Sequence, residues 1–407
     1  MEESRVLRSG ESAMNKVECE AEVLTIEAGR ALLAEAAAIP RVRPSDIARW
    51  RKTTPTGWGA AALRLIEGRR KGAAKFTRAD RMWLDPVGVE QATSEVVARH
   101  KARRFDRSPV VDLCSGIGGD SIALANSGLV LAVDLDEGMG RRAAWNAQVY
   151  DVSDRVLPIR ARAEVFPIPA GARVHVDPDR RATGSSRARS IRDYAPGLEF
   201  LRDLPGRARG GAIKLGPASD YESHFGGPNF EIEIISLNGE CKEATIWFGD
   251  LADPKVRRRA TSLPSGTTWT DLDAPSTSWQ VEGPLDAFVF DPDPALTRSG
   301  LLDGFALAHG LHRIGSGHDL LTGPRPVGSA LLATFEVVED FPLDLKILRR
   351  VVDERGLGPL EIKTRGLDIS PEVYRSVLRP SGPNPATWLL IAGRSGPGRA
   401  ILARRGA

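Results

Sequence analysis

Short apolar runs alternate with helically periodic stretches through the middle of this 407-residue chain. The runs have the length and bounding turns of buried strands, and the stretches between them repeat apolar residues at helical spacing. The pattern predicts strands at Val110–Leu113, Leu129–Val133, Arg155–Ile159, Val174–Val176 and Gly211–Leu215, and helices at Asp120–Asn126 and Met139–Tyr150. Strands that alternate with helices are typical of an α/β fold with a doubly wound parallel sheet.

Two longer apolar stretches follow, Phe230–Leu237 and Ala244–Phe248. The dipeptide Asn238-Gly239 lies between them and favours a two-residue hairpin turn. We therefore expect the parallel strands to be followed by a terminal antiparallel pair.

The two ends of the chain have other patterns. Ala-rich periodic segments predict helices at about Ala21–Ala38, 46–50, Ala60–Lys71 and Val89–Arg104. Near the C-terminus we expect strands at Ala333–Val338, Pro359–Lys363, Thr387–Ala392 and Ala400–Arg404, and helices at Asp344–Arg355 and Pro371–Leu378. The stretch between is rich in Pro, Gly, Ser and Thr. These patterns predict four segments: a helical region (1–105), a nucleotide-binding sheet domain (106–250), a Pro/Gly-rich connector with short strands (251–329) and a small α+β domain (330–407).

Composition limits the class of protein. Hydrophobic residues make up 42% and charged residues 27% of the chain, which is ordinary for a globular protein with sizeable cores. No apolar run is long enough for a membrane span, and the first residues lack the pattern of a signal peptide. The three cysteines, Cys19, Cys114 and Cys241, match no zinc spacing. We therefore expect a cytoplasmic protein with no metal site and no membrane partner.

Basic residues are concentrated on both sides of the sheet domain. Arg41–Arg104 contains 16 Lys or Arg and 6 Asp or Glu, and Lys346–Ala407 contains 12 and 5, whereas the whole chain carries only +3. Clustered positive charge is typical of a protein that binds a polyanion. The alternative is an Arg-rich composition that gives ordinary solvated faces. The N-terminal region and the C-terminal domain are thus candidate RNA-binding parts.

A glycine-rich turn carries the strongest chemical signal. The segment Asp112–Ser121 reads Asp-Leu-Cys-Ser-Gly-Ile-Gly-Gly-Asp-Ser, and Asp134 ends the next strand about 20 residues later. An acid at that place can accept both hydroxyls of a ribose. Acids at both ends of the turn would repel a pyrophosphate, but they suit a cationic nucleoside with an amino-acid tail. S-adenosylmethionine is such a ligand, while a dinucleotide such as NAD and a turn without a ligand are the alternatives.

The segment Asp112–Ser121 resembles class I S-adenosylmethionine-dependent methyltransferases, as do Ala132–Asp136, Asn146-Ala147 and Tyr150. The likeness is to the RNA-methylating branch, which includes the trimethylguanosine synthases. It implies a Rossmann-like seven-stranded sheet, with Asp112, Gly116 and Gly118 at the methionine moiety and Asp134 at the ribose. The candidate cofactor-binding residues are Asp112, Cys114, Gly116, Gly118, Asp134, Leu135, Ala163, Glu164 and Asp177.

The C-terminal domain also resembles a known module. Leu360–Gly366, which reads Leu-Glu-Ile-Lys-Thr-Arg-Gly, is similar to the THUMP-like domain that follows some methyltransferase domains. That name reflects likeness to a module that binds tRNA and rRNA. The resemblance therefore implies an RNA partner by analogy.

The end of the fourth strand is the candidate catalytic site, because ligands bind outside the carboxyl ends of parallel strands. Asp177, Pro178 and Arg180 lie there. Asp177 can orient or deprotonate the methyl acceptor, and Arg180 can hold a phosphate or a base plane. A polar loop with Asp–Arg pairing is the alternative. No aromatic residue follows Pro178, which is a departure from the amino-group methyltransferases of guanine and adenine, so the activity of trimethylguanosine synthases does not carry over.

Three further residues allow two interpretations each, and a fourth is given one. Glu164 either meets the adenine amino group or leaves adenine to apolar and backbone contacts. His175 is either a packed strand residue or a base on the face of Asp177. Lys75, with Phe76, either closes over the cofactor or touches the substrate, or it is a solvated lysine beside a core Phe. Lys214 is expected to be structural.

The sequence thus predicts a methyltransferase that uses S-adenosylmethionine and acts on tRNA or rRNA. Methylation of a small molecule or a protein is one alternative. An RNA-binding protein with a silent cofactor site is the other, because the stacking aromatic is missing.

Overall fold

The computed structural model describes residues 16–105, 109–180, 193–273, 282–315, 318–367, 370–391 and 398–406. The chain splits into two compact units. Unit 1 contains Met1–Leu215, Ser219–Tyr221 and Trp247–Ala252, and unit 2 contains Gly216–Ala218, Glu222–Ile246 and Asp253–Ala407. Within the described ranges, every helix is too short or too polar to cross a membrane.

Unit 1 begins with helices, and those up to residue 72 share a core of their own. The helices are α2 (Glu27–Ala38), α3 (Pro44–Thr53), α4 (Trp58–Gly72), α5 (Pro86–Gln91) and α6 (Glu95–Ala102). Leu32 and Leu33 of α2 lie in one buried cluster with Leu65 of α4 and with Trp50. Apolar residues at helical spacing thus form the packed face of each helix, as the periodicity predicts.

The predicted helix at Val89–Arg104 is two helices in the structure. The ammonium group of Lys75 explains the end of the first, because its Nζ donates to the carbonyl oxygens of Val89 (2.7 Å), Glu90 (3.0 Å) and Ala92 (2.7 Å). These are carbonyls of the type that a helix end leaves without intrahelical partners. A distant lysine therefore ends α5, which helix periodicity alone does not reveal.

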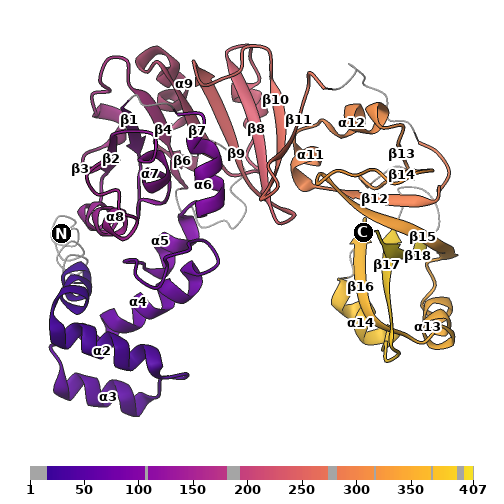
Figure 1. Cartoon of the computed structure of the whole chain (residues 1–407), viewed down its shortest axis with the longest axis horizontal. Coiled ribbons are helices and arrows are strands. Elements are labelled where there is room, and N and C mark those ends of the chain that lie inside the picture. The colour runs from indigo at the N-terminus through magenta and orange to yellow at the C-terminus, as the bar shows by residue number, and fades with distance from the viewer. Residues whose placement is uncertain are drawn as a thin grey trace, which may run out of the picture. The chain divides into compact units, whose positions relative to one another are not determined.

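The main sheet has the strand order β11-β10-β8-β9-β7-β4-β1-β2-β3. Its parallel part in unit 1 consists of β1 (Val110–Leu113), β2 (Val130–Asp134), β3 (Val156–Arg160), β4 (Arg173–Val176) and β7 (Gly210–Leu215). Every residue of β1 and β4 is buried, as in sheets covered on both faces. The helices of this part are α7 (Gly119–Leu124), α8 (Glu137–Val149) and α9 (Leu198–Arg207), with a short η1 (Ala163–Val165) and the pair β5 (Asp179–Arg180) and β6 (Tyr194–Ala195) (Figure 1).

The predicted hairpin is present. Strand β8 (Phe230–Leu237) connects to β9 (Glu240–Gly249), and Asn238 and Gly239 have φ values of 53° and 76°. Positive φ at both central residues is what the favoured hairpin turn requires. Because β9 lies between β7 and β8, the strands follow the order expected of a seven-stranded methyltransferase sheet.

Two further strands extend this sheet beyond the hairpin. They are β10 (Arg258–Leu263), which is parallel to β8, and β11 (Thr267–Thr270). Strand β10 carries few apolar residues. Its Arg259 Nε donates to buried Glu231 at 2.6 Å, and its Thr261 hydroxyl donates to buried Glu233 at 2.6 Å. Polar pairing rather than an apolar pattern holds the strand in place.

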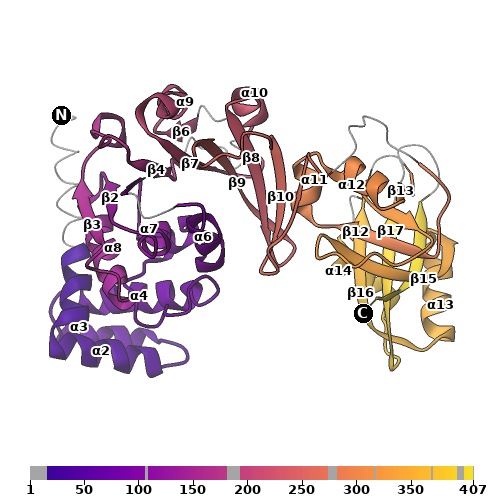
Figure 2. The ribbon, with the colours of Figure 1, turned by 45° about the horizontal axis from the view of Figure 1, so that its top comes forward.

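Unit 2 also contains a second sheet of seven strands, with the order β13-β14-β12-β15-β18-β17-β16. The strands are β12 (Phe288–Pro292), β13 (His312–Arg313), β14 (Leu321–Gly323), β15 (Leu332–Pro342), β16 (Leu357–Arg365), β17 (Asn384–Ile391) and β18 (Arg399–Arg405). The remaining helices of unit 2 are α10 (Glu222–Phe225), α11 (Pro294–Arg298), α12 (Leu302–Ala308), α13 (Leu345–Glu354) and α14 (Pro371–Leu378). Helices α13 and α14 flank the sheet in Figure 2, and their Leu348 and Leu378 share a buried cluster with Trp388.

The predicted α/β class, with a methyltransferase sheet, a helical N-terminal region and a small C-terminal α+β part, is confirmed. The four-segment division stays a prediction. The stretch 251–329 contributes β10 and β11 to the first sheet and β12 to β14 to the second, although its composition predicts a connector.

Candidate functional site

The turn after β1 leaves open space beside one of its glycines. Gly116 and Gly118 have φ values of 54° and 85°, which favour glycine. A Cβ atom on Gly116 would meet nothing within 4 Å, whereas one on Gly118 would lie 3.1 Å from the Cα of Ala143 in α8. Gly118 therefore allows close packing of the helix, and Gly116 borders room for a ligand.

One polar side chain of this turn is partly buried and the next is buried. Cys114 has a φ of 60°, and burial raises the pKa of its thiol far above the usual range, so the thiol stays neutral. The Oγ atom of Ser115 is also buried, and it has no hydrogen-bond partner among the residues that the structure describes. A buried hydroxyl without a partner costs roughly 1–3 kcal/mol, so a polar group of a ligand that reaches it gains a favourable contact.

Asp134 ends β2 and connects it to the same turn. Its Oδ2 accepts a hydrogen bond from the backbone nitrogen of Gly116 at 2.9 Å, and its Oδ1 accepts one from that of Asp136 at 2.9 Å. Burial raises the pKa of this carboxyl, and the two N–H donors oppose the rise. A carboxylate oxygen can accept two hydrogen bonds, so both oxygens keep capacity for ribose hydroxyls.

Exposed apolar side chains follow the carboxyl ends of β2 and β3. Leu135 follows β2 and is 64% exposed, and Val165 of η1 is 74% exposed. Ala163 is buried, while Glu164 lies 3.6 Å from Arg162 in a surface ion pair. Exposed apolar groups beside an open turn suit the faces of a flat ring. Together with the turn and Asp134, they fit the polar tail, ribose and adenine of S-adenosylmethionine.

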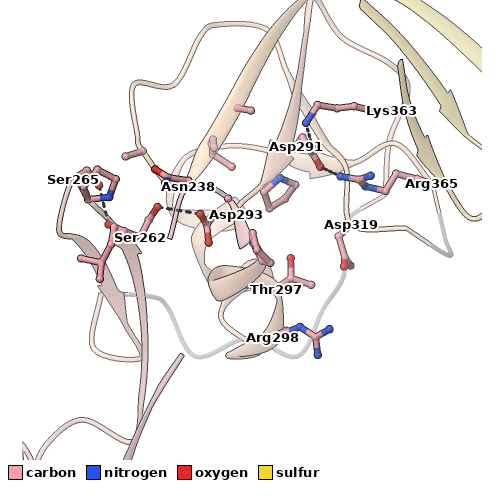
Figure 3. Close-up of a pocket in the computed structure, with 18 of the residues that line it drawn as sticks. Asn238, Ser262, Ser265, Asp291, Asp293, Thr297, Arg298, Asp319, Lys363 and Arg365 are labelled. Atoms are coloured by element: carbon pink, nitrogen blue, oxygen red, sulfur yellow. Dashed lines mark hydrogen bonds and ion pairs between the residues drawn. The ribbon is translucent and has the colours of Figure 1, made fainter. Parts of the chain in front are cut away.

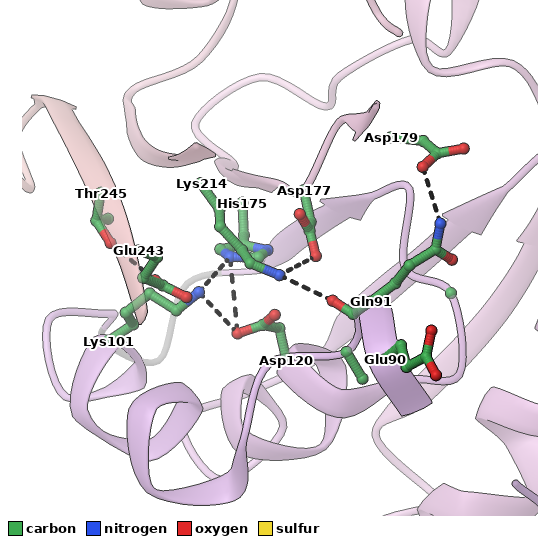
Figure 4. A network of polar contacts seen from close by, with 12 residues as sticks. Glu90, Gln91, Lys101, Asp120, His175, Asp177, Asp179, Lys214, Glu243 and Thr245 are labelled. Carbon is green, nitrogen blue, oxygen red and sulfur yellow. Dashed lines mark hydrogen bonds and ion pairs between the residues drawn. The ribbon is translucent and has the colours of Figure 1, made fainter. Parts of the chain in front are cut away.

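A chain of buried polar side chains lies behind the turn. Oδ1 of Asp112 accepts from His175 Nδ1 at 2.7 Å, and its Oδ2 accepts from the Ser121 hydroxyl. His175 Nε2 lies 3.2 Å from Lys101 Nζ, which pairs with Asp120 at 2.9 Å (Figure 4). Asp112 is only 1% exposed, and each of its oxygens accepts one of these hydrogen bonds.

The carboxylates around His175 determine its state. Burial alone would lower the pKa of His175, but the negative charges of Asp120 and Asp112 raise it. The carboxylate of Asp112 can only accept, so Nδ1 of the ring carries a proton. His175 is 1% exposed, which agrees with the packed interpretation of this residue.

Asp177 follows β4 and is paired with a lysine from β7. Its Oδ2 accepts from Lys214 Nζ at 2.5 Å, and the same ammonium donates to the carbonyl oxygen of Gln91 at 3.2 Å (Figure 4). Burial raises the pKa of Asp177, while Lys214 opposes the rise. Lys214, expected from the sequence to be structural, thus contacts the candidate catalytic acid directly.

The three residues after Asp177 differ in exposure and in their partners. Pro178 is buried, whereas Asp179 is exposed and accepts from the Gln91 side-chain amide at 3.0 Å. The backbone of Arg180 pairs with Tyr194 in the β5–β6 pair, and its side chain lies outside the described residues. The Nζ atom of Lys75 donates to carbonyl oxygens at the end of α5, and Phe76 is buried.

The side chain that fixes the back of the turn has no role that the sequence pattern predicts. The Nδ2 of Asn146 donates to the carbonyl oxygens of Ile117 (3.0 Å) and Trp83 (3.2 Å), and its Oδ1 accepts from the nitrogen of Trp83 (2.7 Å). Asn146 is fully buried on α8. Arg142, one helical turn earlier, is buried too and pairs with Glu20 at 2.7 Å. In the sequence, both residues occupy positions of the helical repeat that face the core, and a polar residue at such a position indicates a buried hydrogen-bonding role.

Metal ligands form no group in the described part of the chain: nowhere in it do three His, Cys, Asp or Glu side chains meet as a metal site would require. The acidic side chains of the site are instead paired with lysines, a histidine or backbone N–H groups.

Comparison with known proteins gives two family matches. Residues 107–176 match the family described as RNA cap guanine-N2 methyltransferase, and residues 332–405 match the family described as THUMP domain-like. Two curated proteins, both called uncharacterized S-adenosylmethionine-dependent methyltransferase, come from Mycobacterium tuberculosis strains CDC 1551 and H37Rv. Each is 33% identical over 308 residues, which are 74% of this chain and 83% of the relative.

A solved structure shares the fold along almost the whole chain. It is a crystal structure from Porphyromonas gingivalis W83, provisionally described as a methyltransferase. The two chains are 20% identical, with a TM-score of 0.75, and the match covers 95% of this chain and 99% of the other. At this identity the likeness bears on the fold alone.

Proposed function

Because the chain belongs to the S-adenosylmethionine-dependent methyltransferases, we propose that its methyl acceptor is an RNA, of the tRNA or rRNA class. One observation carries this proposal: the chain joins a segment that matches an RNA cap guanine-N2 methyltransferase family to one that matches a THUMP domain-like family. The basic residues of Arg41–Arg104 and of Lys346–Ala407 support it, because a polyanion is attracted to clustered positive charge.

The cofactor-binding residues are proposed from the geometry of the turn. Gly116 borders the open space, Asp134 offers two carboxylate oxygens to the ribose hydroxyls, and Leu135 offers an apolar surface to adenine. Cys114, Gly118, Ala163 and Glu164 complete the proposed lining. Asp112 acts as a positioning residue, because it bonds to Ser121 and His175 behind the turn.

The acceptor is proposed to lie at the carboxyl end of β4. When bound, S-adenosylmethionine supplies an electrophilic methyl group on a sulfonium, which needs an acceptor lone pair directed at it. Lys214 holds one oxygen of Asp177, so the other can accept a hydrogen bond from an N–H or O–H of the acceptor and direct that lone pair. Pro178 shapes the wall of this site, and Arg180 binds a phosphate or a base plane.

The chemistry at the acceptor atom need not be that of the matched family. Pro178 is followed by Asp179 and Arg180, so the aromatic side chain on which a base would stack is missing at this place. We therefore propose RNA as the substrate class and do not assign the guanine amino group as the acceptor.

The test is methyl transfer from labelled S-adenosylmethionine to total RNA, protein and small molecules from a strain that lacks the gene. Label in RNA, followed by a methylated nucleoside in mass spectrometry, supports the proposal and names the base. Label only in protein or in small molecules would refute the RNA target. RNA binding without transfer to any fraction would make the chain a silent RNA-binding protein.

A further inference from the structure

A large open cavity lies within unit 2, away from the glycine-rich turn. Its volume is about 940 Å³, near the upper end of the range for sites that bind small ligands. Its walls come from the β8–β9 turn, the β10–β11 turn, α11, β12, β15, β16 and β18. Most of this lining precedes residue 332, so the cavity is largely built from parts outside the THUMP domain-like match.

One buried carboxylate organises two cations in this cavity. Asp291 Oδ2 lies 2.7 Å from Lys363 Nζ, and its Oδ1 lies 2.5 Å from a terminal nitrogen of Arg365 (Figure 3). The Asp291 side chain is 8% exposed, whereas those of Lys363 and Arg365 are 25% and 38% exposed. The carboxylate therefore lies at the buried bottom of the cluster, and the two cationic side chains reach solvent.

The cluster keeps positive charge and donor capacity. Lys363 also lies 3.8 Å from Glu361, which pairs with Arg405 at 3.1 Å. Three cations thus share two carboxylates, so one positive charge is not neutralised within the cluster. A lysine has three N–H donors and an arginine five. Lys363 donates to Asp291, and Arg365 donates to Asp291 and to its own neighbour Thr364. The remaining donors suit an anion with several oxygens, which a phosphate provides.

The other acids of the lining are engaged. Asp293 accepts from the nitrogen of Ala295 at 2.8 Å and from the Ser262 hydroxyl at 3.0 Å, so it caps α11. Asp319 pairs with Arg313 at 2.8 Å. Two further cations, Arg298 and Arg405, also line the cavity. Four basic residues thus face three acids, each of which has a hydrogen-bond or ion-pair partner.

Neutral polar groups complete the wall. Asn238, Ser262, Ser265 and Thr297 bring amide and hydroxyl groups to the cavity. Such groups can hydrogen-bond a sugar or a base edge, whereas a bare phosphate uses only the cations. A ligand that carries a phosphate, a ribose and a base would use both parts of the lining.

We propose that this cavity binds a short single-stranded segment of the RNA substrate, with a backbone phosphate at Lys363 and Arg365. The inference rests on the proposed function, and it makes the cavity a substrate-binding subsite separate from the glycine-rich turn. Asp291 is a positioning residue, because it holds the two cations at a fixed separation.

The test is binding of a fluorescently labelled single-stranded oligouridylate to the full chain, measured by anisotropy at several salt concentrations. Lys363→Gln and Arg365→Gln are each expected to weaken binding about tenfold, the usual effect of losing a charge-assisted hydrogen bond. The slope of log affinity against log salt is expected to fall by about 0.7 for the lost phosphate contact.

Arg350→Gln is the matched control. Arg350 lies on α13 of the same unit, is 66% exposed and has a 3.9 Å ion pair with Glu354. The Arg350→Gln substitution changes the net charge by the same amount as the cavity substitutions, but Arg350 lies outside the cavity lining. Thermal unfolding of all three variants shows whether each one folds, and Arg405→Gln, at an exposed position, replaces any variant that does not.

Four outcomes would overturn the inference. If the cavity variants bind the oligouridylate as well as Arg350→Gln does, the cavity is not an RNA subsite. If uridine 5′-monophosphate competes as well as the oligomer, the ligand is a free nucleotide instead. If wild-type protein methylates RNA while Lys363→Gln keeps the wild-type KM for RNA, the cavity inference fails alone. If wild-type protein methylates and binds no RNA, the proposed function fails and the inference fails with it.

Discussion

Asp177 in unit 1 and Asp291 in unit 2 are both carboxylates bonded to a lysine, but their surroundings differ. Asp177 has one lysine on one oxygen, and Asp120 and His175 lie in the polar network nearby. Asp291 has a cation on each oxygen. In the described part of the chain, one oxygen of Asp177 thus has a side-chain partner and the other has none, whereas each oxygen of Asp291 holds a cation.

The comparison shows how the same pair of residue types can serve two purposes. A carboxylate with a free acceptor position can orient a proton-bearing atom at the reaction centre. A carboxylate with two cations leaves excess positive charge and spare N–H donors, which suit an anion. We therefore expect changes at Asp177 to alter turnover, and changes around Asp291 to alter RNA affinity.

The largest effect is expected from Asp177→Asn. The amide keeps the shape but removes the charge and half of the acceptor capacity, so turnover should fall by about 10²–10⁴-fold, the usual contribution of a general base or orienting group. Affinity for S-adenosylmethionine should stay within about twofold, because Asp134 and the turn hold the cofactor in our proposal. Single-turnover methyl transfer and calorimetry measure the two quantities.

Asp179→Asn is the control for that experiment. Asp179 is two residues away, exposed and bonded to the Gln91 side chain, so its loss should leave turnover near the wild-type value. Wild-type turnover in Asp177→Asn would remove this residue from the mechanism. Proximity and orientation would then be the main source of rate.

A smaller effect is expected from Lys214→Met. Without the ammonium group, Asp177 loses its 2.5 Å partner and becomes free to rotate, so kcat should fall by about 10²-fold while the KM for RNA stays constant. Lys214→Arg should recover part of the rate. Lys363→Gln should do the opposite, raising the KM for RNA and leaving kcat unchanged. If Lys214→Met and Lys363→Gln change kcat and KM equally, the two carboxylates do not serve different purposes.

The glycine-rich turn and its flanking strands were predictable because each depends on local pattern. Strand β8 and helix α14 have the predicted bounds, Phe230–Leu237 and Pro371–Leu378, since an unbroken apolar pattern and clear start and stop residues mark them. Strand β10 could not be found this way. Its buried Thr261 satisfies Glu233 of another strand, and such a pairing is invisible until the strands are adjacent.

The site shows the same limit. The positions of Gly116, Asp134 and Asp177 at strand ends follow from their places in the sequence. The pairing of Lys214 with Asp177 depends on the order of β4 and β7, and that of Lys101 with Asp120 depends on how α6 packs on α7. Contacts between elements distant in sequence decide which charged residue is structural and which acts at the site.

A third prediction concerns the cofactor. Asp134→Ala should lower the affinity for S-adenosylmethionine by roughly ten- to a hundredfold, about 1.5–3 kcal/mol, because hydrogen bonds to the ribose hydroxyls are lost and the nitrogen of Gly116 loses its acceptor. Titration calorimetry with the cofactor measures this change. Glu137→Ala, on the exposed start of α8, is the control, since its only ion pair is with the surface residue Arg160 in the described part of the chain. Equal affinities of the two variants would contradict the assignment.

The smallest expected effect is a pH dependence of stability from the buried network of unit 1. The carboxylates near His175 raise its pKa in the folded chain above the unfolded value of about 6.5, against the effects of burial and of the Lys101 ammonium. A raised folded-state pKa contributes stability that is complete below the unfolded value and is lost as the pH rises through the folded one. The free energy of unfolding should therefore fall above about pH 6.5, by at most about 1.4 kcal/mol per pH unit for one proton. His175→Gln should lose this part of the slope in urea unfolding, while Lys363→Gln, which leaves His175 and its carboxylates in place, should keep it. A wild-type slope in His175→Gln would show that His175 is not the group that titrates.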